Sequence, residues 1–432
     1  MSSYKRVDYT TIYGGIMQFN KNKDVGIHRW YPFVEGYSKE FIKSILEELD
    51  FIPKVCLDPF SGSGTTSLEL QNSGIKCFSF EISPFMYDLS RTKLKTNYSV
   101  NGFEKTLFEI KSILSNNIDN IENITYFPKY KNYVENDSLE KWHYDKDVML
   151  GICDIKYAIK NIKNKNYESL YKIALASILL QVSNMYRNGK CLSYKRKTNN
   201  RVKYNRESVK NLFLSRLEDI FRSDIEKLSK FYKENKIKSN YPYCYKGDAR
   251  KLVKKLDDDS IDLVITSPPY LNSRDYTDSY IDELRVLEYL KEGSSEQEYR
   301  AKTLCSHVQV KWDYIKPLDI PLLVETYNKI SAYKDKFWNK SLLNMIAGYF
   351  NDMDVLFGAF SKKLKEKGRI YFNVGNSAYF GVEVKVDEII AAIAEQKGFK
   401  VVEIRDARRM PPSSQQRSSF GHLMESVIVL EK

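Results

Sequence analysis

The sequence has few of the residues that bind metals or build disulfide frameworks. Its 432 residues include only 4 histidines and 6 cysteines, no two cysteines form a CxxC pair, and the histidines do not cluster near them. This spacing predicts neither a zinc site nor a disulfide framework. The chain also lacks an apolar signal segment at its start and any apolar run of membrane-spanning length. We therefore expect no membrane association and a reducing, cytoplasmic location.

Acidic residues are outnumbered by basic ones, 56 against 68, which gives a formal net charge of +12. Part of the lysine excess reflects a general Lys, Asn, Ile and Tyr bias, but a basic surface still concentrates polyanions by long-range steering. Nucleic acid is thus the natural partner. Hydrophobic residues make up 42% and charged residues 29%, the balance of a folded protein. No internal repeat is present, so we expect one catalytic core with insertions.

The region around residue 60 has the pattern of a βαβ unit. Residues 55–58 predict a short buried strand, residues 59–66 a glycine loop, the next residues a helix, and residues 76–81 a second strand. Such units imply a parallel sheet with right-handed crossovers. The sequence therefore predicts an α/β fold.

The remaining chain alternates between helical and sheet-forming stretches. Apolar spacing predicts helices over 103–114, 148–162, 170–185, 342–364 and 386–396. Strands are predicted near 243–245 and over 261–265, 369–374, 400–405 and 425–430, and the final pair is expected to close the sheet with an antiparallel edge. We divide the chain into core segments 1–98, 241–290 and 341–432, a helical insertion 99–240 that recognises or clamps DNA, and a smaller insertion 291–340.

Two glycines stand at the strand-to-helix bend in Asp-Pro-Phe-Ser-Gly-Ser-Gly-Thr-Thr, residues 58–66, where the backbone can approach a ligand closely. A phosphate loop would carry a lysine here, and none is present. Asp58 would repel a phosphate but can accept a hydrogen bond from an amino group. Glu81 ends the second strand, a position from which a carboxylate can accept both ribose hydroxyls. The alternative for Glu81 is an ordinary surface acid.

This loop resembles the cofactor motif of amino-methyltransferases that act on nucleic-acid bases. The resemblance implies S-adenosylmethionine and a class I methyltransferase fold, which is Rossmann-like and mostly parallel with an antiparallel last strand, here with a large helical insertion. It also implies that Asp248 binds the adenine amino group of the cofactor, although Asp248 could instead cap a helix over 249–256. The expected cofactor-binding residues are Asp58, Pro59, Phe60, Ser61, Gly62, Gly64, Thr65, Glu81, Ile82, Asp248 and Ala249.

Residues 28–37, just before the glycine loop, correspond in that family to a segment that also lines the cofactor pocket. They are rich in aromatic residues, and Ser38 can cap the helix that follows. The alternative is a hydrophobic lid packed against the sheet.

A second motif, Thr266-Ser267-Pro268-Pro269-Tyr270, follows strand 261–265 directly. Ligands of open α/β sheets bind at the carboxyl ends of strands. The Ser267 oxygen and the Pro268 carbonyl can accept the two hydrogens of an exocyclic amine, and the prolines, Pro268 and Pro269, fix the backbone. Tyr270 offers a face on which a flipped base can stack. The alternative is a rigid surface turn.

The SPPY sequence is similar to the motif of enzymes that make N4-methylcytosine or N6-methyladenine, and its serine favours cytosine. Covalent catalysis is not expected, because no Pro-Cys pair is present. The resemblance implies an S-adenosylmethionine-dependent DNA methyltransferase in restriction-modification or phage defence, with double-stranded DNA and a cognate restriction endonuclease or defence-system component as partners. An RNA methyltransferase and a catalytically silent DNA-binding subunit are the alternatives.

The stretch from Arg187 to Arg206 contains eight basic residues and no acidic one, with tyrosines interleaved. Such density can neutralise phosphates, although a solvated lysine-rich loop would look the same. A second basic stretch begins at residue 405, and Arg274 follows the catalytic motif. The expected DNA-binding residues are Arg187, Lys190, Lys195, Arg196, Lys197, Arg201, Lys203, Arg274, Arg408 and Arg409.

Overall fold

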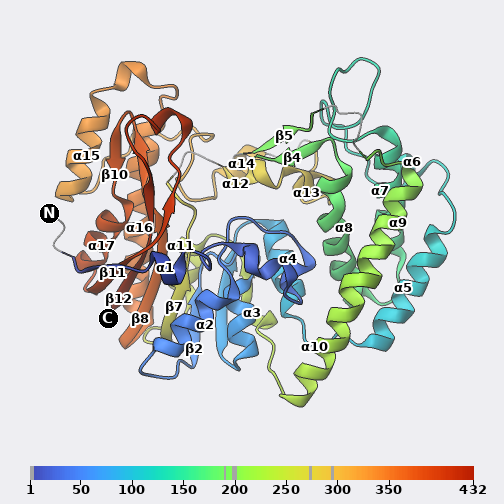
Figure 1. Ribbon diagram of the computed structural model, residues 1–432, viewed down its shortest axis with the longest axis horizontal. Helices are drawn as coiled ribbons and strands as arrows, with labels where there is room; N and C mark the ends of the chain where they lie inside the picture. The colour runs from blue at the N-terminus through green and yellow to red at the C-terminus, as the bar shows by residue number, and fades with distance from the viewer. Residues whose placement is uncertain (1–3, 189–190, 197–201, 272–274, 293–295) are drawn as a thin grey trace.

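A computed structural model describes residues 4–188, 191–196, 202–271, 275–292 and 296–432. Its centre is an eight-stranded sheet in the order β1-β11-β12-β8-β7-β2-β3-β6 (Figure 1). The strands are β1 (Arg6–Asp8), β2 (Val55–Asp58), β3 (Lys76–Glu81), β6 (Cys244–Lys246), β7 (Ile261–Thr266), β8 (Leu364–Gly375), β11 (Lys400–Met410) and β12 (Leu423–Glu431).

All neighbouring strands in this sheet are parallel except β12, which runs antiparallel to both β8 and β11. This arrangement confirms the expected α/β methyltransferase fold with an antiparallel last strand. We expected the antiparallel strand at the edge of the sheet, but β12 lies inside it, between β8 and β11. β1 pairs in parallel with β11 through Arg6 and Ile404 and forms the edge instead.

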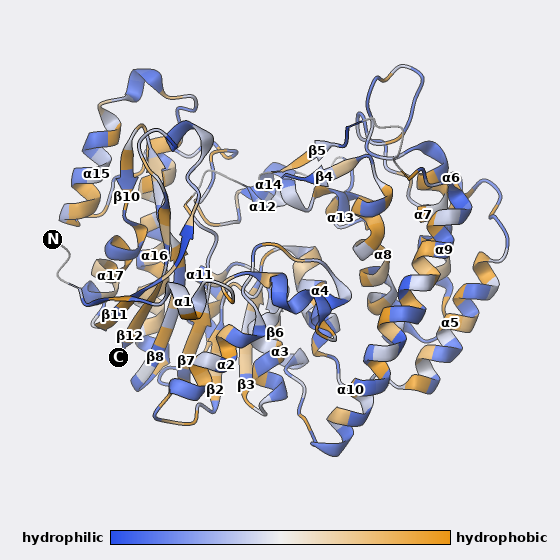
Figure 2. Ribbon diagram, viewed as in Figure 1, coloured by the Kyte–Doolittle hydropathy of each residue, from blue (hydrophilic) through white to orange (hydrophobic). Residues whose placement is uncertain are grey.

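Helices cover both faces of the sheet, as its alternating side chains require. In β7 and β8, Val264 and Phe372 point into one core with α11 (Ala249–Leu252), α16 (Leu342–Lys363) and α17 (Val386–Gln396). Ile265 and Tyr371 point into the opposite core with α1 (Thr10–Tyr13) and α2 (Lys39–Glu48). On that face α3 (Thr65–Asn72) and α4 (Pro84–Leu94) follow β2 and β3. The central strands are largely apolar because both of their faces are buried (Figure 2).

Residues 99–240 form a mainly helical lobe beside α4 (Figure 1). Its α8 is buried on all sides at the middle of the lobe, which its continuous apolar sequence requires. One hydrophobic core joins the lobe to α4, so the lobe packs on the sheet layers directly. Its helices are α5 (Val100–Leu114), α6 (Ile121–Ile124), α7 (Lys146–Asn161), α8 (Glu168–Val182), α9 (Arg206–Arg216) and α10 (Ser223–Glu234), with a π-helical turn, Leu217–Arg222, before α10.

The predicted helix over 170–185 ends earlier, at Val182, because β4 (Met185–Arg187) and β5 (Leu192–Tyr194) follow as an antiparallel hairpin. This hairpin lies inside the basic stretch and was not predicted. Short helices α12 (Tyr276–Ser279), α13 (Ile281–Val286) and α14 (Glu296–Arg300) connect the helical lobe to the sheet (Figure 1). Helix α15 (Pro321–Ser331) and the hairpin of β9 (Ser377–Tyr379) and β10 (Val382–Val384) complete the fold. Within the described residues, no helix combines the length and apolarity needed to cross a membrane.

Candidate methyltransferase site

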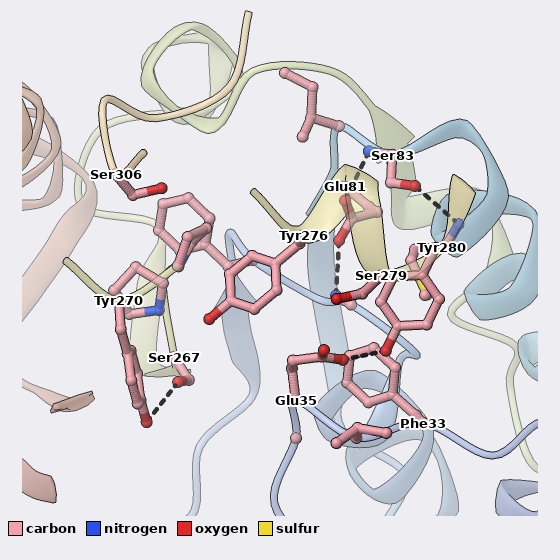
Figure 3. A pocket seen from close by; sticks show the side chains of 18 of the residues that line it. Phe33, Glu35, Glu81, Ser83, Ser267, Tyr270, Tyr276, Ser279, Tyr280 and Ser306 are labelled. Carbon is pink, nitrogen blue, oxygen red and sulfur yellow. Dashed lines mark hydrogen bonds between the residues drawn. The ribbon is translucent and has the colours of Figure 1, made fainter. Parts of the chain in front are cut away.

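A cavity of about 580 Å³ opens at the edge of the sheet where the parallel strands end (Figure 3). Pro59, Phe60 and Gly62 of the glycine loop line it on one side, together with Glu81 and Ile82. Residues 267–270 line it on another side, after β7. Asp58 and Thr266, which precede the two motifs, are 208 residues apart in the chain, and the sheet brings the motifs to the same cavity because β2 pairs with β7.

The glycine loop depends on backbone angles that other residues adopt with strain. Gly62 has φ +48° and Gly64 has φ +80°, both in the left-handed region. A Cβ on Gly64 would lie 2.5 Å from the Ser90 Oγ, so the start of α3 packs closely against α4. The loop therefore needs glycine at this position both for its conformation and for its packing.

Asp58 lies beneath the loop and is 1% exposed. Its Oδ1 accepts hydrogen bonds from the Thr266 hydroxyl at 2.7 Å and from the Phe60 N–H at 3.2 Å. Burial raises the pKa of Asp58 to about 6. The carboxylate orders the loop and joins it to the end of β7. It does not line the cavity, in contrast to the direct cofactor contact that we expected. Three other expected cofactor residues also lie outside the lining: Ser61, Gly64 and Thr65.

Glu81 lines the cavity at the end of β3. Its two carboxylate oxygens accept hydrogen bonds from the N–H groups of Gly62, at 2.8 Å, and Ser83, at 2.7 Å (Figure 3). Each oxygen keeps a second lone pair, so both can also accept from a ligand hydroxyl. Burial raises the pKa of Glu81 to about 7.

Asp248 caps a helix, one of the two roles that the sequence left open, and its contact with the cofactor stays a prediction. It is the N-cap of α11 and accepts from the Arg250 N–H, and its carboxylate also pairs with the Arg250 side chain at 2.9 Å. Asp248 and Ala249 both line the cavity next to the glycine loop. A helix-capping carboxylate at this wall remains able to accept from an amino group with its remaining lone pairs.

The segment over 28–37 divides into two parts. His28 and Trp30 are buried and bonded to neighbouring helices, through Glu69 at 2.8 Å and Asp224 at 3.0 Å. Phe33 and the residues up to 37 line the cavity. The Phe33 ring stacks on the Tyr280 ring, with 6.0 Å between the ring centroids. The second half of the segment therefore lies where the cofactor-pocket interpretation expects it, whereas the first half packs against helices and not against the sheet. We expected the Ser38 side chain to cap α2. It does not, because its hydroxyl donates to the Gln18 carbonyl.

The catalytic motif rests on two residues that sequence reasoning missed. The Tyr270 hydroxyl donates to the Glu425 Oε1 at 2.6 Å and accepts from the Asn373 Nδ2 at 2.7 Å. Burial holds the pKa of Tyr270 well above its usual range. Asn373 lies near the end of β8 and Glu425 near the start of the antiparallel β12, so both reach the same edge of the sheet. The sequence signal that could have revealed Glu425 is an acidic residue within the largely apolar strand β12.

Comparisons with known proteins agree with this architecture. A Type II methyltransferase of Geobacillus stearothermophilus, M.BsoBI, is 27% identical to this chain, with 96% of this chain and 88% of the relative aligned. M.AvaI of Nostoc sp. is 21% identical over 90% of this chain and 82% of the relative, and M.MvaI of Kocuria varians is 24% identical over 62% and 58%. Two of these three Type II methyltransferases align along nearly the whole chain. These relatives support a DNA methyltransferase family for this chain.

No family model matches the sequence. Among solved structures, a candidate DNA modification methylase from Thermus thermophilus aligns with 43% of this chain and 50% of its own chain, with 14% identity and a TM-score of 0.21.

The expected DNA-binding residues fall into groups with different surroundings in the structure. Arg187 and Arg408 are engaged with internal carboxylates, those of Glu283 and Glu425, each at 2.6 Å. Lys195 donates to backbone carbonyls at the C-terminal end of α8, including that of Ser183 at 2.8 Å. Exposed positions are held by Arg196, Lys203 and Arg409. Four residues lie outside the described part of the chain: Lys190, Lys197, Arg201 and Arg274.

The internal pairing of Arg187 changes its expected role. Its guanidinium also donates to the Tyr31 hydroxyl at 2.7 Å and to the Ser279 carbonyl at 2.9 Å. These bonds fix the β4–β5 hairpin to the wall of the cavity and leave little of the side chain for a phosphate. Residues 196 and 203 flank the same hairpin and remain exposed.

Proposed function

We propose that this protein is a site-specific DNA methyltransferase that transfers a methyl group from S-adenosylmethionine to the exocyclic amino group of a flipped base. We further propose that cytosine N4 is preferred over adenine N6. The observation that carries this proposal is the single cavity lined by both the glycine loop and Ser267–Tyr270. A methyl donor and an amine acceptor must meet within bonding distance, and one shared cavity satisfies that requirement.

The residues at one side of the cavity fit the cofactor. Glu81 keeps a lone pair on each oxygen for two ribose hydroxyls. Gly62 lines the cavity and, having no side chain, lets a ligand approach the loop closely. The Phe33 ring covers the loop, since a Cβ on Gly62 would lie 3.1 Å from it. When bound, the cofactor supplies an electrophilic methyl group on a sulfonium centre.

At the other side, the chain's own residues orient the amine. Its lone pair is delocalised into the base ring, and acceptors for both amino hydrogens localise it toward the methyl group. Ser267 Oγ and the Pro268 carbonyl are suited to accept these hydrogens, and no metal or covalent intermediate is required. The Tyr270 ring provides the stacking surface that offsets part of the cost of base extrusion, a few kcal/mol.

DNA approaches, in this proposal, across the edge of the sheet at which the cavity opens. The exposed basic residues Arg196, Lys203 and Arg409 would contact phosphates, and the helical lobe would clamp or read the duplex. Because the relatives are Type II methyltransferases, we place the protein in a restriction-modification system in the cytoplasm, with a cognate endonuclease as its functional partner.

The decisive experiment is transfer of labelled methyl from S-adenosylmethionine to genomic DNA and, separately, to total RNA, followed by nucleoside analysis. We expect N4-methylcytosine in DNA at one short recognition sequence. N6-methyladenine in DNA would replace the proposed base and keep the rest of the proposal. Label confined to RNA would overturn the DNA substrate, and cofactor binding without any transfer would indicate a silent DNA-binding subunit. Ser267→Ala serves as the matched inactive control.

A further inference from the structure

A continuous hydrogen-bond chain runs from the catalytic motif into the sheet. The Ser267 Oγ donates to the Tyr270 hydroxyl at 3.4 Å, and that hydroxyl donates to the Glu425 Oε1 at 2.6 Å (the first bond is drawn in Figure 3). The other carboxylate oxygen, Oε2, accepts two N–H groups of Arg408, at 2.6 and 2.7 Å. Glu425 itself is 2% exposed, whereas Ser267 and Tyr270 are half-buried at the cavity wall.

The ion pair between Glu425 and Arg408 sets the direction of every hydrogen bond from Glu425 to Ser267. A carboxylate held by a guanidinium carries lone pairs only and cannot donate. The Tyr270 hydroxyl must therefore give its proton to Glu425, and its oxygen is left to accept. Asn373 agrees with this direction, because its Nδ2 donates to the Tyr270 oxygen at 2.7 Å and to Glu425 at 3.1 Å. Within the described residues its Oδ1, on the side away from these bonds, has no partner.

The direction of the hydrogen bonds at Glu425 determines whether Ser267 presents a donor or an acceptor to the cavity. Since the Tyr270 oxygen accepts, the Ser267 hydrogen points toward Tyr270 and away from the substrate side. The Asn373 Nδ2 donates to one lone pair of the Ser267 oxygen at 3.4 Å, and the other lone pair remains for a ligand in the cavity that Ser267 lines. An acceptor at this place suits an amino group, whose hydrogens need acceptors, and is mismatched to a carbonyl group, which has none to give.

We propose that Glu425, held by Arg408, is a positioning residue that fixes Ser267 as a hydrogen-bond acceptor and so selects bases with an exocyclic amino group. This inference rests on the proposed function, since it assumes that Ser267 contacts the reacting amine. Glu425 acts on Ser267 through the Tyr270 hydroxyl and through Asn373, whose Nδ2 donates both to Glu425 at 3.1 Å and to the Ser267 Oγ at 3.4 Å.

The substitution that tests this is Glu425→Gln. Arg408 still needs an acceptor, so the new amide oxygen faces Arg408 and the amide nitrogen faces Tyr270. The amide then donates to the Tyr270 oxygen, the Tyr270 hydroxyl turns toward Ser267, and the Ser267 hydrogen is directed into the cavity. Size and packing are preserved while the direction of the chain is reversed.

Two measurements separate this effect from general damage. The first is single-turnover methyl transfer to a duplex that carries the mapped recognition sequence. The second is the ratio of affinities for that duplex and for the same duplex with the target amine replaced by a carbonyl, that is, uracil for cytosine or hypoxanthine for adenine. We expect Glu425→Gln to slow transfer about 100-fold and to lower the amine-to-carbonyl ratio about tenfold. Cofactor affinity is expected to stay unchanged.

The matched control is Glu403→Gln. Glu403 is a buried acid on β11 that pairs with Arg405 at 2.8 Å, but it lies away from the cavity, and we expect its substitution to leave both measurements unchanged. Tyr270→Phe keeps the ring and the Glu425–Arg408 pair while removing the central hydroxyl. We expect it to lower the affinity ratio as well, which keeps the inference testable even if Glu425→Gln fails to fold.

The outcomes are distinct. If the wild-type protein methylates DNA but both variants retain its affinity ratio, the inference is wrong and the proposed function stands. Slower transfer with an unchanged ratio also overturns it, since a merely structural role predicts that result. If the wild-type protein transfers no methyl group to DNA, the proposed function fails and the inference fails with it.

Discussion

The carboxylate of Glu81 accepts a hydrogen bond from the backbone N–H of Gly62, with 2.8 Å between Oε2 and N. The bond joins the end of β3 to the loop that follows β2, two segments 19 residues apart. Through it, the glycine loop and the expected ribose acceptor hold one another in place. A change at Glu81 should therefore affect cofactor binding both directly and through the shape of the loop.

We expect Glu81→Ala to weaken S-adenosylmethionine binding about 100-fold, because two hydrogen bonds to a charged acceptor are lost at about 1.5 kcal/mol each. Glu81→Gln keeps one acceptor oxygen and should cost about tenfold. Isothermal titration calorimetry measures both. Glu325→Gln, on the exposed face of α15, is the control and should bind as the wild type does. Unchanged affinity in Glu81→Ala would remove Glu81 from the cofactor site.

The pKa values of the two acids near the loop predict a pH dependence. Burial raises the pKa of Glu81 from 4.5 to about 7 and that of Asp58 from 3.8 to about 6. Ribose hydroxyls bind better to the ionised form of Glu81, so cofactor affinity should rise as the pH increases from about 5 to about 8. Titrations at several pH values check this, and Glu81→Gln should flatten the upper part of the curve.

Stability of the cofactor-free protein should change in the opposite direction. Between the ordinary and raised pKa values the folded protein binds more protons than the unfolded chain, so its stability falls as the pH rises through that window, from about 4 to about 7. Thermal unfolding across this range is the test. A variant with both Asp58→Asn and Glu81→Gln should show a smaller decrease, and an equal decrease would contradict the assignment.

Sequence patterns predicted the parts of this protein that depend on local chemistry. Apolar runs bounded by turns predicted β2, β3 and β7 nearly to the residue, since strands buried on both faces leave that signal. The three-residue strands of the β4–β5 hairpin carry too little pattern to be detected. Glu425 was missed because its place beside Tyr270 follows from the order of strands in the sheet, which local sequence does not encode. The same holds for the partner of Arg187, which lies 96 residues away.

Tyr270→Ala should separate base handling from cofactor binding. Its ring is expected to stack on the flipped base, and loss of one stacking contact costs about 1–3 kcal/mol. We therefore predict that kcat/KM for DNA falls at least tenfold, while the dissociation constant for S-adenosylmethionine changes less than twofold. Steady-state methyl transfer and calorimetry give the two values. Equal loss of both would place Tyr270 in the cofactor pocket instead.

The basic stretch between Arg187 and Arg206 contains residues that should behave in opposite ways. Arg187→Ala leaves Glu283, which is 1% exposed, without its cation, so we expect a loss of about 3 kcal/mol in unfolding free energy. Chemical denaturation measures this loss. Arg196 and Lys203 are exposed, and reversing their charges to Glu should leave the unfolding free energy within about 0.5 kcal/mol of wild type.

The two exposed residues, Arg196 and Lys203, should instead affect DNA binding. Each phosphate contact contributes about one unit to the slope of log affinity against log salt concentration, so Arg196→Glu with Lys203→Glu should reduce the slope by about two. Fluorescence anisotropy with a labelled duplex at several salt concentrations measures the slope, and cofactor affinity serves as the internal control. If the slope stays the same while unfolding is normal, the exposed residues beside the β4–β5 hairpin do not face DNA. The duplex would then have to approach from the side of Arg409, across the loop between β11 and β12, because that position is the remaining exposed basic residue of the expected set within the described chain.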